Sequence, residues 1–262
     1  MDCQKNSLSV NHLRVQIKDY KNTLTPIINN VHLRIPQGRI VALVGESGCG
    51  KTLTSLAIMN LLQRNIVASG EIFCNGHALH SMSVRQRAAY NGSLLGLIFQ
   101  EPVEALDPLF TIEQQMWEGL KRHKHVSRKA GHAIICNGLK RVNFQDPTAI
   151  LQKYPHELSG GMCQRVMIAS VLIQEVAYII ADEPTTALDV TIQKQILIQL
   201  YRLSREQNIG ILFITHDLSA VAEIADYVYI MKQGSILEEG DVFSIFDKPQ
   251  YTYTKELITR TI

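Results

Sequence analysis

The sequence predicts an α/β fold: a largely parallel, buried sheet with an antiparallel β piece at the amino end and an inserted helical lobe. The main observation is a set of short β-branched runs separated by segments with helical patterning, namely RIVALVG from Arg39, LLGLIF from Leu94, VAYIIAD from Val176 and GILFIT from Gly210. Such runs are typical of parallel strands covered on both faces by other elements. Upstream, SLSVNHLRVQI and PIINNVHLRI alternate instead, which predicts half-exposed antiparallel strands.

The helical lobe is predicted between Thr111 and Leu151, where strand signals stop. A polar, helix-leaning stretch replaces them and carries the basic residues Lys121, Arg122, Lys124, Arg128 and Lys129. No internal repeat or low-complexity linker divides the chain. We therefore expect a single domain over residues 1–262, with a core of about residues 1–100 and 170–262 and a helical subdomain of about residues 101–169.

Charge and cysteine usage exclude several classes of protein. The 26 basic and 24 acidic residues give a net charge of +2, which argues against a protein whose main task is to bind nucleic acid. The five cysteines form no C-x-x-C pair, so the pattern favours a reducing, cytosolic setting over a zinc or disulfide framework. The first ten residues lack the apolar core of a signal peptide, and Gln174 and Glu175 interrupt the most apolar stretch. We expect any membrane connection to come through a partner.

The strongest local signal is a G-x-x-x-x-G-K-T sequence between a strand-like and a helix-like segment, made of Gly45, Glu46, Ser47, Gly48, Cys49, Gly50, Lys51 and Thr52. Glycines let the backbone turn successive N–H groups towards phosphate oxygens, and the following helix directs its positive end at the same anion. Lys51 is expected to neutralise the β and γ phosphates, and the Thr52 hydroxyl to bind Mg²⁺. The sequence therefore predicts a nucleoside triphosphate site.

Two carboxylates end the apolar strand YIIADE, where a buried strand normally avoids charge. Asp182 is expected to hold the magnesium through water. Glu183 is expected to orient, or accept a proton from, the water that attacks the γ-phosphate.

A small-residue turn, LSGGMCQR from Leu158, opens the next helical segment. Together with the phosphate loop and the Asp-Glu strand, it resembles the signature sequence of the ATP-binding cassette (ABC) family, and the resemblance covers nearly the whole chain. It implies a P-loop NTPase fold of the ABC type with a RecA-like core. It also implies that two such subunits face each other across two ATP molecules, with Ser159, Gly160, Gly161 and Gln164 serving the nucleotide held by the partner.

Four further matches follow from the resemblance. Gln100, after LLGLIF, matches the Q-loop glutamine that senses magnesium and attacking water, and whose loop meets the transmembrane subunits. His216, after GILFIT, matches the switch histidine on the γ-phosphate. Ala187, Leu188 and Asp189 match the loop that couples the two sites. Tyr20 is the only aromatic residue before Phe73 and is the candidate for stacking on adenine.

The branch of the family is indicated by residues outside these motifs. Met162 in the signature, the segment IFQEPVEALDPLFTI and the segment KPQYTYTKELI from Lys248 look like the peptide and nickel importer branch. Peptide importers of that branch commonly continue into a cysteine-containing tail, whereas the last cysteine here is Cys163. We therefore expect an ATPase for import of nickel or a nickel–chelator complex, with import of di- or oligopeptides as the alternative.

The resemblance also implies the assembly. The expected partners are a second, identical or homologous ATP-binding subunit, two transmembrane permease subunits and, through the permease, an extracytoplasmic substrate-binding protein. The chain would then lie peripherally on the cytoplasmic face of the inner membrane. His123, His125 and His132 in the helical lobe are interpreted as part of a solvated basic face, not as a metal site.

Two other classes share the phosphate loop. A soluble cassette ATPase acting on DNA, chromosomes or ribosomes usually has coiled-coil insertions, zinc cysteines or two cassettes, and none occurs in this sequence. An NTP-dependent kinase or switch protein would leave the Ser-Gly-Gly turn, Gln100 and His216 without a role.

Overall fold

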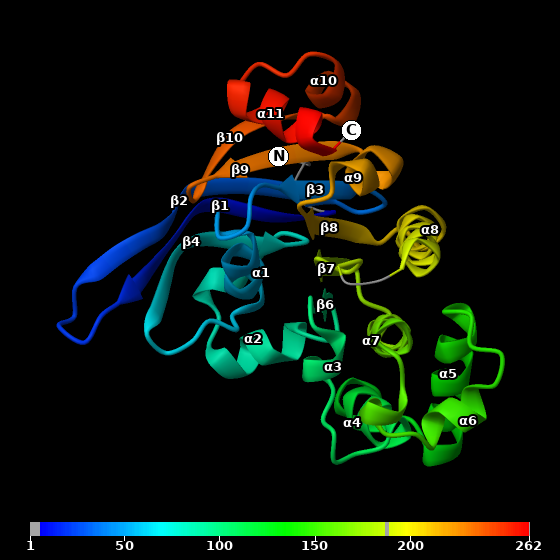
Figure 1. Ribbon diagram of the computed structural model, residues 1–262. Coiled ribbons are helices and arrows are strands. Elements are labelled where there is room, and N and C mark those ends of the chain that lie inside the picture. The colour runs from blue at the N-terminus through cyan, green and yellow to red at the C-terminus, as the bar shows by residue number, and fades with distance from the viewer. Residues whose placement is uncertain (1–5, 187–188, 262) are drawn as a thin grey trace.

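The computed structural model describes residues 6–186 and 189–261, which form two sheets surrounded by helices (Figure 1). The first sheet has the order β2-β1-β4-β5 and is antiparallel. Its strands are β1 Ser7–Lys18, β2 Leu24–Pro36, β4 Ile66–Cys74 and β5 His77–Ala78. The two alternating segments of the amino end are β1 and β2, so the prediction of an antiparallel β piece is confirmed.

The second sheet has the order β10-β9-β3-β8-β7-β6 and is parallel except for β10, which pairs antiparallel with β9. Its strands are β3 Ile40–Val44, β6 Leu95–Ile98, β7 Tyr178–Asp182, β8 Gly210–Thr215, β9 Tyr227–Lys232 and β10 Ser235–Asp241. The four apolar runs are β3, β6, β7 and β8. The sequence analysis missed β9 and β10, the latter because acidic residues interrupt its apolar pattern.

Successive side chains of β3 enter two different cores. Ile40, Ala42 and Val44 pack on the side of helices α7, α8 and α9, while Val41 and Leu43 pack on the side of α1 and the first sheet. This follows from the two-residue side-chain period of a strand. The parallel sheet is therefore covered on both faces, which explains why its strands are apolar throughout.

The helices begin at residues suited to their ends: Thr111 and Gln114 form a capping box before α4, and Ser127 caps α5. Among the described residues, no helix has the length and apolar character needed to cross a bilayer. The helices are α1 Lys51–Met59, α2 Val84–Tyr90, α3 Pro102–Ala105, α4 Ile112–His123, α5 Arg128–Arg141, α6 Pro147–Leu151, α7 Gly160–Leu172, α8 Val190–Gln207, α9 Leu218–Ile224, α10 Val242–Asp247 and α11 Thr252–Thr261, with short 3₁₀ turns at Leu79–Ser81 and Pro155–Glu157.

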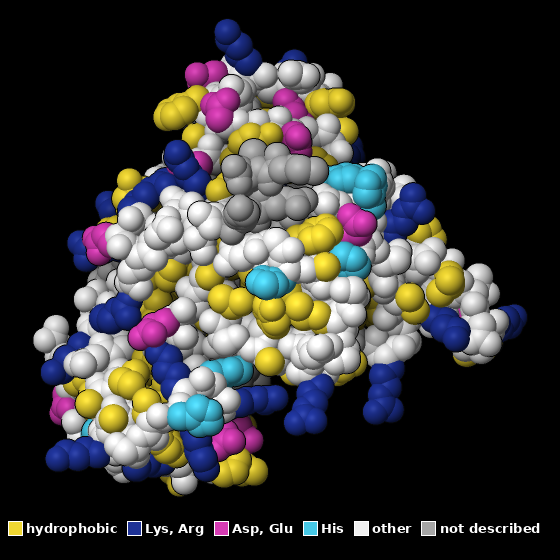
Figure 2. Space-filling view, turned by 180° about the vertical axis from the view of Figure 1, so that it is seen from behind, with side chains coloured by type: hydrophobic (Ala, Val, Ile, Leu, Met, Phe, Trp, Pro, Cys, Tyr) yellow, Lys and Arg dark blue, Asp and Glu magenta, His cyan; other side chains and the backbone are white. Residues whose placement is uncertain are grey.

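The helical lobe comprises α4, α5 and α6, which pack on one another, and α4 and α5 also pack on α7. It lies at one end of the molecule, while α10 and α11 lie at the other, beside β9 and β10 (Figure 1). Seen from behind, Lys and Arg side chains stand around the lobe (Figure 2). The sequence-based domain boundaries stay a prediction; α7 runs across the second of them.

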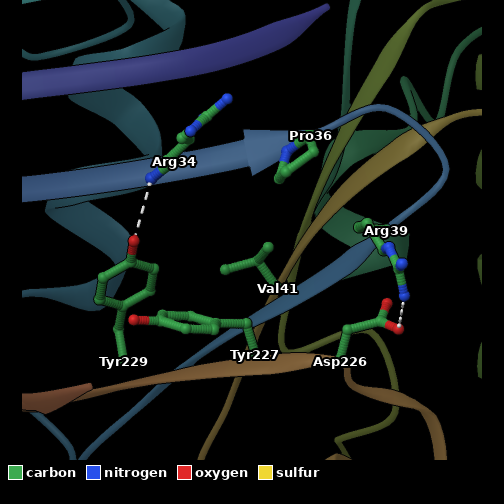
Figure 3. Close-up of a pocket in the computed structure, with 7 residues that line it drawn as sticks. All are labelled: Arg34, Pro36, Arg39, Val41, Asp226, Tyr227 and Tyr229. Carbon is green, nitrogen blue, oxygen red and sulfur yellow. Dashed lines mark hydrogen bonds and ion pairs between the residues drawn. The ribbon is translucent and has the colours of Figure 1, made fainter. Parts of the chain in front are cut away.

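A pocket of about 510 Å³ lies where β3 and β9 begin, at the opposite end of β3 from the phosphate loop (Figure 3). Asp226 organises one side of it, accepting hydrogen bonds from Arg39 (2.9 Å), Arg205 (2.8 Å) and the N–H of Ile40 (2.8 Å). Burial alone would raise the pKa of Asp226, but these donors and the charge of Arg205 outweigh it and hold the pKa below its usual range. Asp226, Arg39 and Arg205 are therefore paired with one another within the chain, and we interpret this pocket as structural.

Replacing Asp226 with Asn is expected to destabilise the fold at pH 7 by about 1–3 kcal/mol, because two arginines lose a charged acceptor. A carboxylate with a lowered folded-state pKa stabilises above its unfolded pKa, and this contribution is lost as pH falls through the folded value. Urea unfolding at several pH values should therefore show the gap between variant and wild type closing below about pH 4. Exposed Asp247→Asn is the control, and a gap that is as wide at pH 3 as at pH 7 would contradict the assignment.

Candidate nucleotide-binding site

The phosphate loop, residues 45–52, connects β3 to α1. Gly50 caps α1 with φ 113° and without a side-chain hydrogen bond, so the first-turn N–H groups are left to a ligand. A side chain at Gly45 would place Cβ 2.3 Å from the carbonyl oxygen of Met231, which only glycine avoids. The shape of the loop therefore depends on glycine at two positions. The backbone of Gly45 lies close to that of Met231, and Gly50 has a left-handed conformation.

The side chain of Lys51 lies over the phosphate loop. Its Nζ donates to the carbonyl oxygens of Gly45 (2.8 Å) and Glu46 (3.1 Å), which compensate a nearly buried charge. Because its present partners are neutral carbonyls, the ammonium can exchange these hydrogen bonds for bonds to a phosphate at little cost in free energy. Cys49 contributes backbone only: its side chain is buried, and burial raises the pKa of its thiol.

Thr52 and Asp182 meet at the end of β7. The Thr52 hydroxyl lies 3.4 Å from Asp182 Oδ1, and Ser55 Oγ donates to Asp182 Oδ2 at 2.9 Å. Burial raises the pKa of Asp182, opposed by the Ser55 and Thr52 hydrogen bonds, and the charge of Glu183 raises it further. A desolvated carboxylate beside a hydroxyl fits Mg²⁺, which takes one or two protein ligands and otherwise binds phosphates and water.

Glu183 Oε2 is the meeting point of three strand ends. It lies 3.4 Å from Gln100 Nε2 after β6, 3.3 Å from His216 Nδ1 after β8, and 2.9 Å from Thr186 Oγ1 in its own turn. The backbone at Glu183 is left-handed, with φ 46°. A left-handed non-glycine residue is uncommon and is concentrated at functional sites. The structure therefore brings together the three residues predicted from separate runs.

Gln100, Glu183 and His216 line one cavity with the phosphate loop, whereas Cys49 and Asp182 do not line it. Its volume of about 480 Å³ is within the range of small-molecule sites. Its lining residues are Gly45, Glu46, Ser47, Gly48, Gly50, Lys51, Thr52, Leu53, Gln100, Glu183, His216 and Leu257. Leu257 comes from α11, at the far end of the chain.

Other predicted residues do not line this cavity. Ser159 caps α7 and is exposed with Gly160, and Asp189 caps α8. Gly161 is packed against Ile192, where a Cβ would lie 2.8 Å from a side-chain carbon. Ala187 and Leu188 lie outside the described residues.

Two predicted residues are placed differently from the expectation. Gln164 is 1% exposed and faces the interior, because the face of α7 that carries it packs on the core. Tyr20 is 90% exposed at the hairpin between β1 and β2 and does not line the cavity. Direct contact of either side chain with a nucleotide therefore stays a prediction.

Sequence reasoning missed Ser55, Thr186 and Leu257. Ser55 lies one helical turn after Lys51, so its position relative to the loop was available from the helical period. Thr186 follows Glu183 by three residues in a turn. Leu257 gave no local signal, because its contact depends on how α11 packs.

Comparison with known proteins identifies close sequence relatives. A family model described as ABC transporter matches residues 28–186. The dipeptide transport ATP-binding protein DppD of Bacillus subtilis (strain 168) is 42% identical over 253 residues, covering 96% of this chain and 75% of that protein. The glutathione import ATP-binding protein GsiA of Escherichia coli O1:K1 / APEC is 40% identical over 261 residues, covering 96% of this chain. The chain spans 41% of the length of that GsiA.

Solved structures agree on the fold. The ATP-binding cassette MJ0796, in a dimeric post-hydrolysis state bound to ADP and Pi, superposes with a TM-score of 0.80 at 24% identity, over 90% of this chain and 98% of that chain. CbiO1 of Clostridium perfringens, part of the transporter complex cbiONQ, gives 0.76 at 26% identity, over 98% and 94%. The predicted fold class is therefore confirmed.

Proposed function

The chain belongs to the ABC transporter family, and on this premise we propose that it binds and hydrolyses ATP to energise an importer whose cargo is a small peptide. The observation that carries the ATPase part is the convergence of Gln100, Glu183 and His216 at the mouth of the phosphate-loop cavity. A site for binding alone would not need a carboxylate, an amide and an imidazole around one point.

The residues have separable roles in hydrolysis. The loop N–H groups and Lys51 hold the triphosphate and compensate charge on the γ-phosphate. Glu183 accepts a hydrogen bond from the attacking water, and Gln100 restricts where that water can lie. His216, more than half exposed, can donate to a γ-phosphate oxygen. Thr186 keeps the Glu183 carboxylate turned towards this point.

We assign the magnesium that accompanies ATP to Thr52 and Asp182, whose oxygens already face each other. When bound, the ion supplies electrostatic stabilisation of charge on the β and γ oxygens. Ser55 is the residue that orients Asp182.

Ser55→Ala is expected to raise the Mg²⁺ concentration for half-maximal ATP hydrolysis roughly tenfold, as loss of a hydrogen bond to a metal-binding carboxylate usually does. Hydrolysis by the purified protein is measured against Mg²⁺ at saturating ATP. Ser170→Ala is the matched control, because Ser170 also donates to a carbonyl of its own helix but touches no carboxylate. An unchanged Mg²⁺ dependence would remove Asp182 from the assigned pair.

We propose that a second copy, or a homologous subunit, completes the site. Ser159 and Gly160 are exposed at the amino end of α7 but do not line the cavity of their own chain. The amino end of a helix attracts anions, and the γ-phosphate of a nucleotide on a facing subunit would fit at the amino end of α7. The dimeric state described for MJ0796 supports this arrangement.

We place the permease at the groove between the core and the helical lobe. A cavity of about 330 Å³ is lined there by residues of β6, α4 and α7. The segment that follows β6 in the sequence exposes four large apolar side chains, Phe99, Val103, Leu109 and Phe110. Clustered exposed apolar side chains mark protein contacts. Two permease subunits would hold the chain at the cytoplasmic face of the inner membrane and connect it to an extracytoplasmic substrate-binding protein.

The choice of cargo rests on the names of the relatives. DppD is a dipeptide transport protein and GsiA a glutathione import protein, and both cover nearly the whole of this chain. These names favour a peptide as the cargo. The sequence alone had instead favoured nickel, because no cysteine follows Cys163. The names also favour an importer over a soluble ATPase acting on nucleic acid or ribosomes.

Uptake in cells tests the proposal. Cells of the source organism carrying Glu183→Gln at the chromosomal locus are compared with wild type for uptake of a labelled dipeptide, labelled glutathione and radioactive nickel. Loss of dipeptide or glutathione uptake with nickel uptake intact is expected. Selective loss of nickel uptake would overturn the peptide cargo, and three unchanged uptakes would overturn the importer assignment.

A further inference from the structure

The carboxyl-terminal helix α11 is anchored by a buried carboxylate. Glu238 on β10 is 8% exposed and accepts hydrogen bonds from the backbone N–H groups of Gln250 (2.8 Å) and Tyr251 (3.4 Å). The hydroxyl of Thr254 donates to the same carboxylate. Because the donors are the two residues just before α11 and Thr254 in its first turn, Glu238 fixes where this helix begins and which face it turns inward.

The inward face reaches the phosphate loop. The hydroxyl of Tyr253, 7% exposed, accepts a hydrogen bond from the backbone N–H of Glu46 at 3.1 Å. The ammonium of Lys232 lies 4.3 Å from the centroid of the Tyr253 ring, a cation–π contact that also helps to hold the ring. The loop is therefore tied at its second residue to a helix 207 positions away in the sequence.

One turn further along α11, Leu257 lines the cavity itself. Among the described residues that line it, Leu53 and Leu257 carry the apolar side chains, and the others offer glycine backbone, hydroxyls or charged and amide groups. An apolar side chain does not bind phosphate. It matches the uncharged part of a nucleotide, the sugar or the base.

We propose that α11 is a wall of the nucleotide site, in which Tyr253 is a positioning residue for the phosphate loop and Leu257 contacts the sugar or base of ATP. The inference rests on the proposed ATP binding and deepens it. Tyr253 acts by keeping the loop in its binding shape, because apparent affinity falls with the fraction of molecules in the competent state. The segment KPQYTYTKELI thereby gains a role in nucleotide affinity.

Tyr253→Phe tests the positioning role, since it removes the hydroxyl and keeps the ring. Binding of a non-hydrolysable ATP analogue and of inorganic tripolyphosphate is measured by calorimetry on the full chain. Both dissociation constants should rise about three- to tenfold, the scale of one hydrogen bond. The hydrolysis rate at saturating ATP should stay within about twofold, since the bond touches no reacting atom. Tyr251→Phe, in the same segment, is the control.

Leu257→Ala tests the contact with the nucleotide. It should weaken the ATP analogue about three- to tenfold, as loss of a buried apolar contact does, and leave tripolyphosphate unchanged. Ile258→Ala is the matched control, because Ile258 packs on the same core but does not line the cavity. The melting temperature of each variant separates a local effect from unfolding.

The outcomes distinguish the inference from the proposed function. Wild-type protein that binds neither ligand would overturn ATP binding itself. Wild-type protein that binds both, with affinities unchanged in Tyr253→Phe and Leu257→Ala, would overturn the role of α11 alone. Equal weakening by Ile258→Ala and Leu257→Ala would assign the effect to helix packing and also overturn the contact.

Discussion

Glu183→Gln is expected to lower the rate of ATP hydrolysis by about two to four orders of magnitude, while ATP still binds. Gln keeps the shape of Glu and can still hydrogen-bond Gln100, Thr186 and His216 in part, but it cannot accept a proton or hold water with a full charge. The structure gives the reason for the size of the effect, because these three side chains lie around the single oxygen Oε2. Steady-state phosphate release and equilibrium ATP binding are the two measurements.

Glu175→Gln provides a matched control for this prediction. Glu175 also has a positive φ, 57°, but its side chain is exposed and pairs with Lys124. Such a surface pair contributes little to stability, so hydrolysis should be unchanged. If Glu183→Gln hydrolyses ATP at more than about a tenth of the wild-type rate, Glu183 does not act as general base.

Lys51→Ala is expected to weaken ATP binding about 100-fold or more. The variant loses the ammonium that would neutralise the β and γ phosphates, and charged hydrogen bonds in a partly dry site contribute about 1.5–3 kcal/mol each. Within the described part of the chain, the hydrogen bonds of the Lys51 ammonium go to neutral carbonyls of its own loop, so its charge is available to the nucleotide. Calorimetric titration with the non-hydrolysable analogue measures the change.

Lys140→Ala, on the exposed side of α5, is the control for net charge. It should bind the analogue as wild type does. The melting temperature of Lys51→Ala without nucleotide checks that the loop still folds. A Lys51→Ala variant that is folded and binds ATP within about threefold of wild type would contradict the phosphate role.

The sequence predicted the parts of the site that depend on local rules. The phosphate loop was recognisable because its glycines, lysine and threonine have fixed spacing between a strand and a helix. Glu183 was predicted because two carboxylates end a buried strand, whereas Gln100 and His216 were assigned through their resemblance to the family's Q-loop and switch positions. Parallel strands carry the residues that follow them to one edge of the sheet. The meeting of all three at one carboxylate oxygen could be seen only in the structure, since strand order sets it.

What the sequence did not predict depends on packing between distant segments. β10 was missed because Glu238 and Glu239 break its apolar pattern, although buried Glu238 holds α11. The resemblance assigned Gln164 to the nucleotide held by the partner, and the packing of α7 turns this side chain inward. Tyr20 was chosen as the only aromatic residue in its region, and the hairpin leaves it exposed.

The separation of the site among four strand ends has a consequence for local unfolding. β3, β7 and β8 are internal strands of one sheet, and β6 is its edge strand, paired with β7. The residues that β3, β7 and β8 place can therefore be lost only when that sheet opens. Helix α11, which ends at Thr261, is not a strand of this sheet and is attached through hydrogen bonds of Glu238 and Tyr253. It can therefore fray without the sheet opening. Amide hydrogen exchange should therefore be slowest in β3 and β7 and much faster in α11. Bound nucleotide should slow the exchange of α11, because its contact with this helix opposes local unfolding.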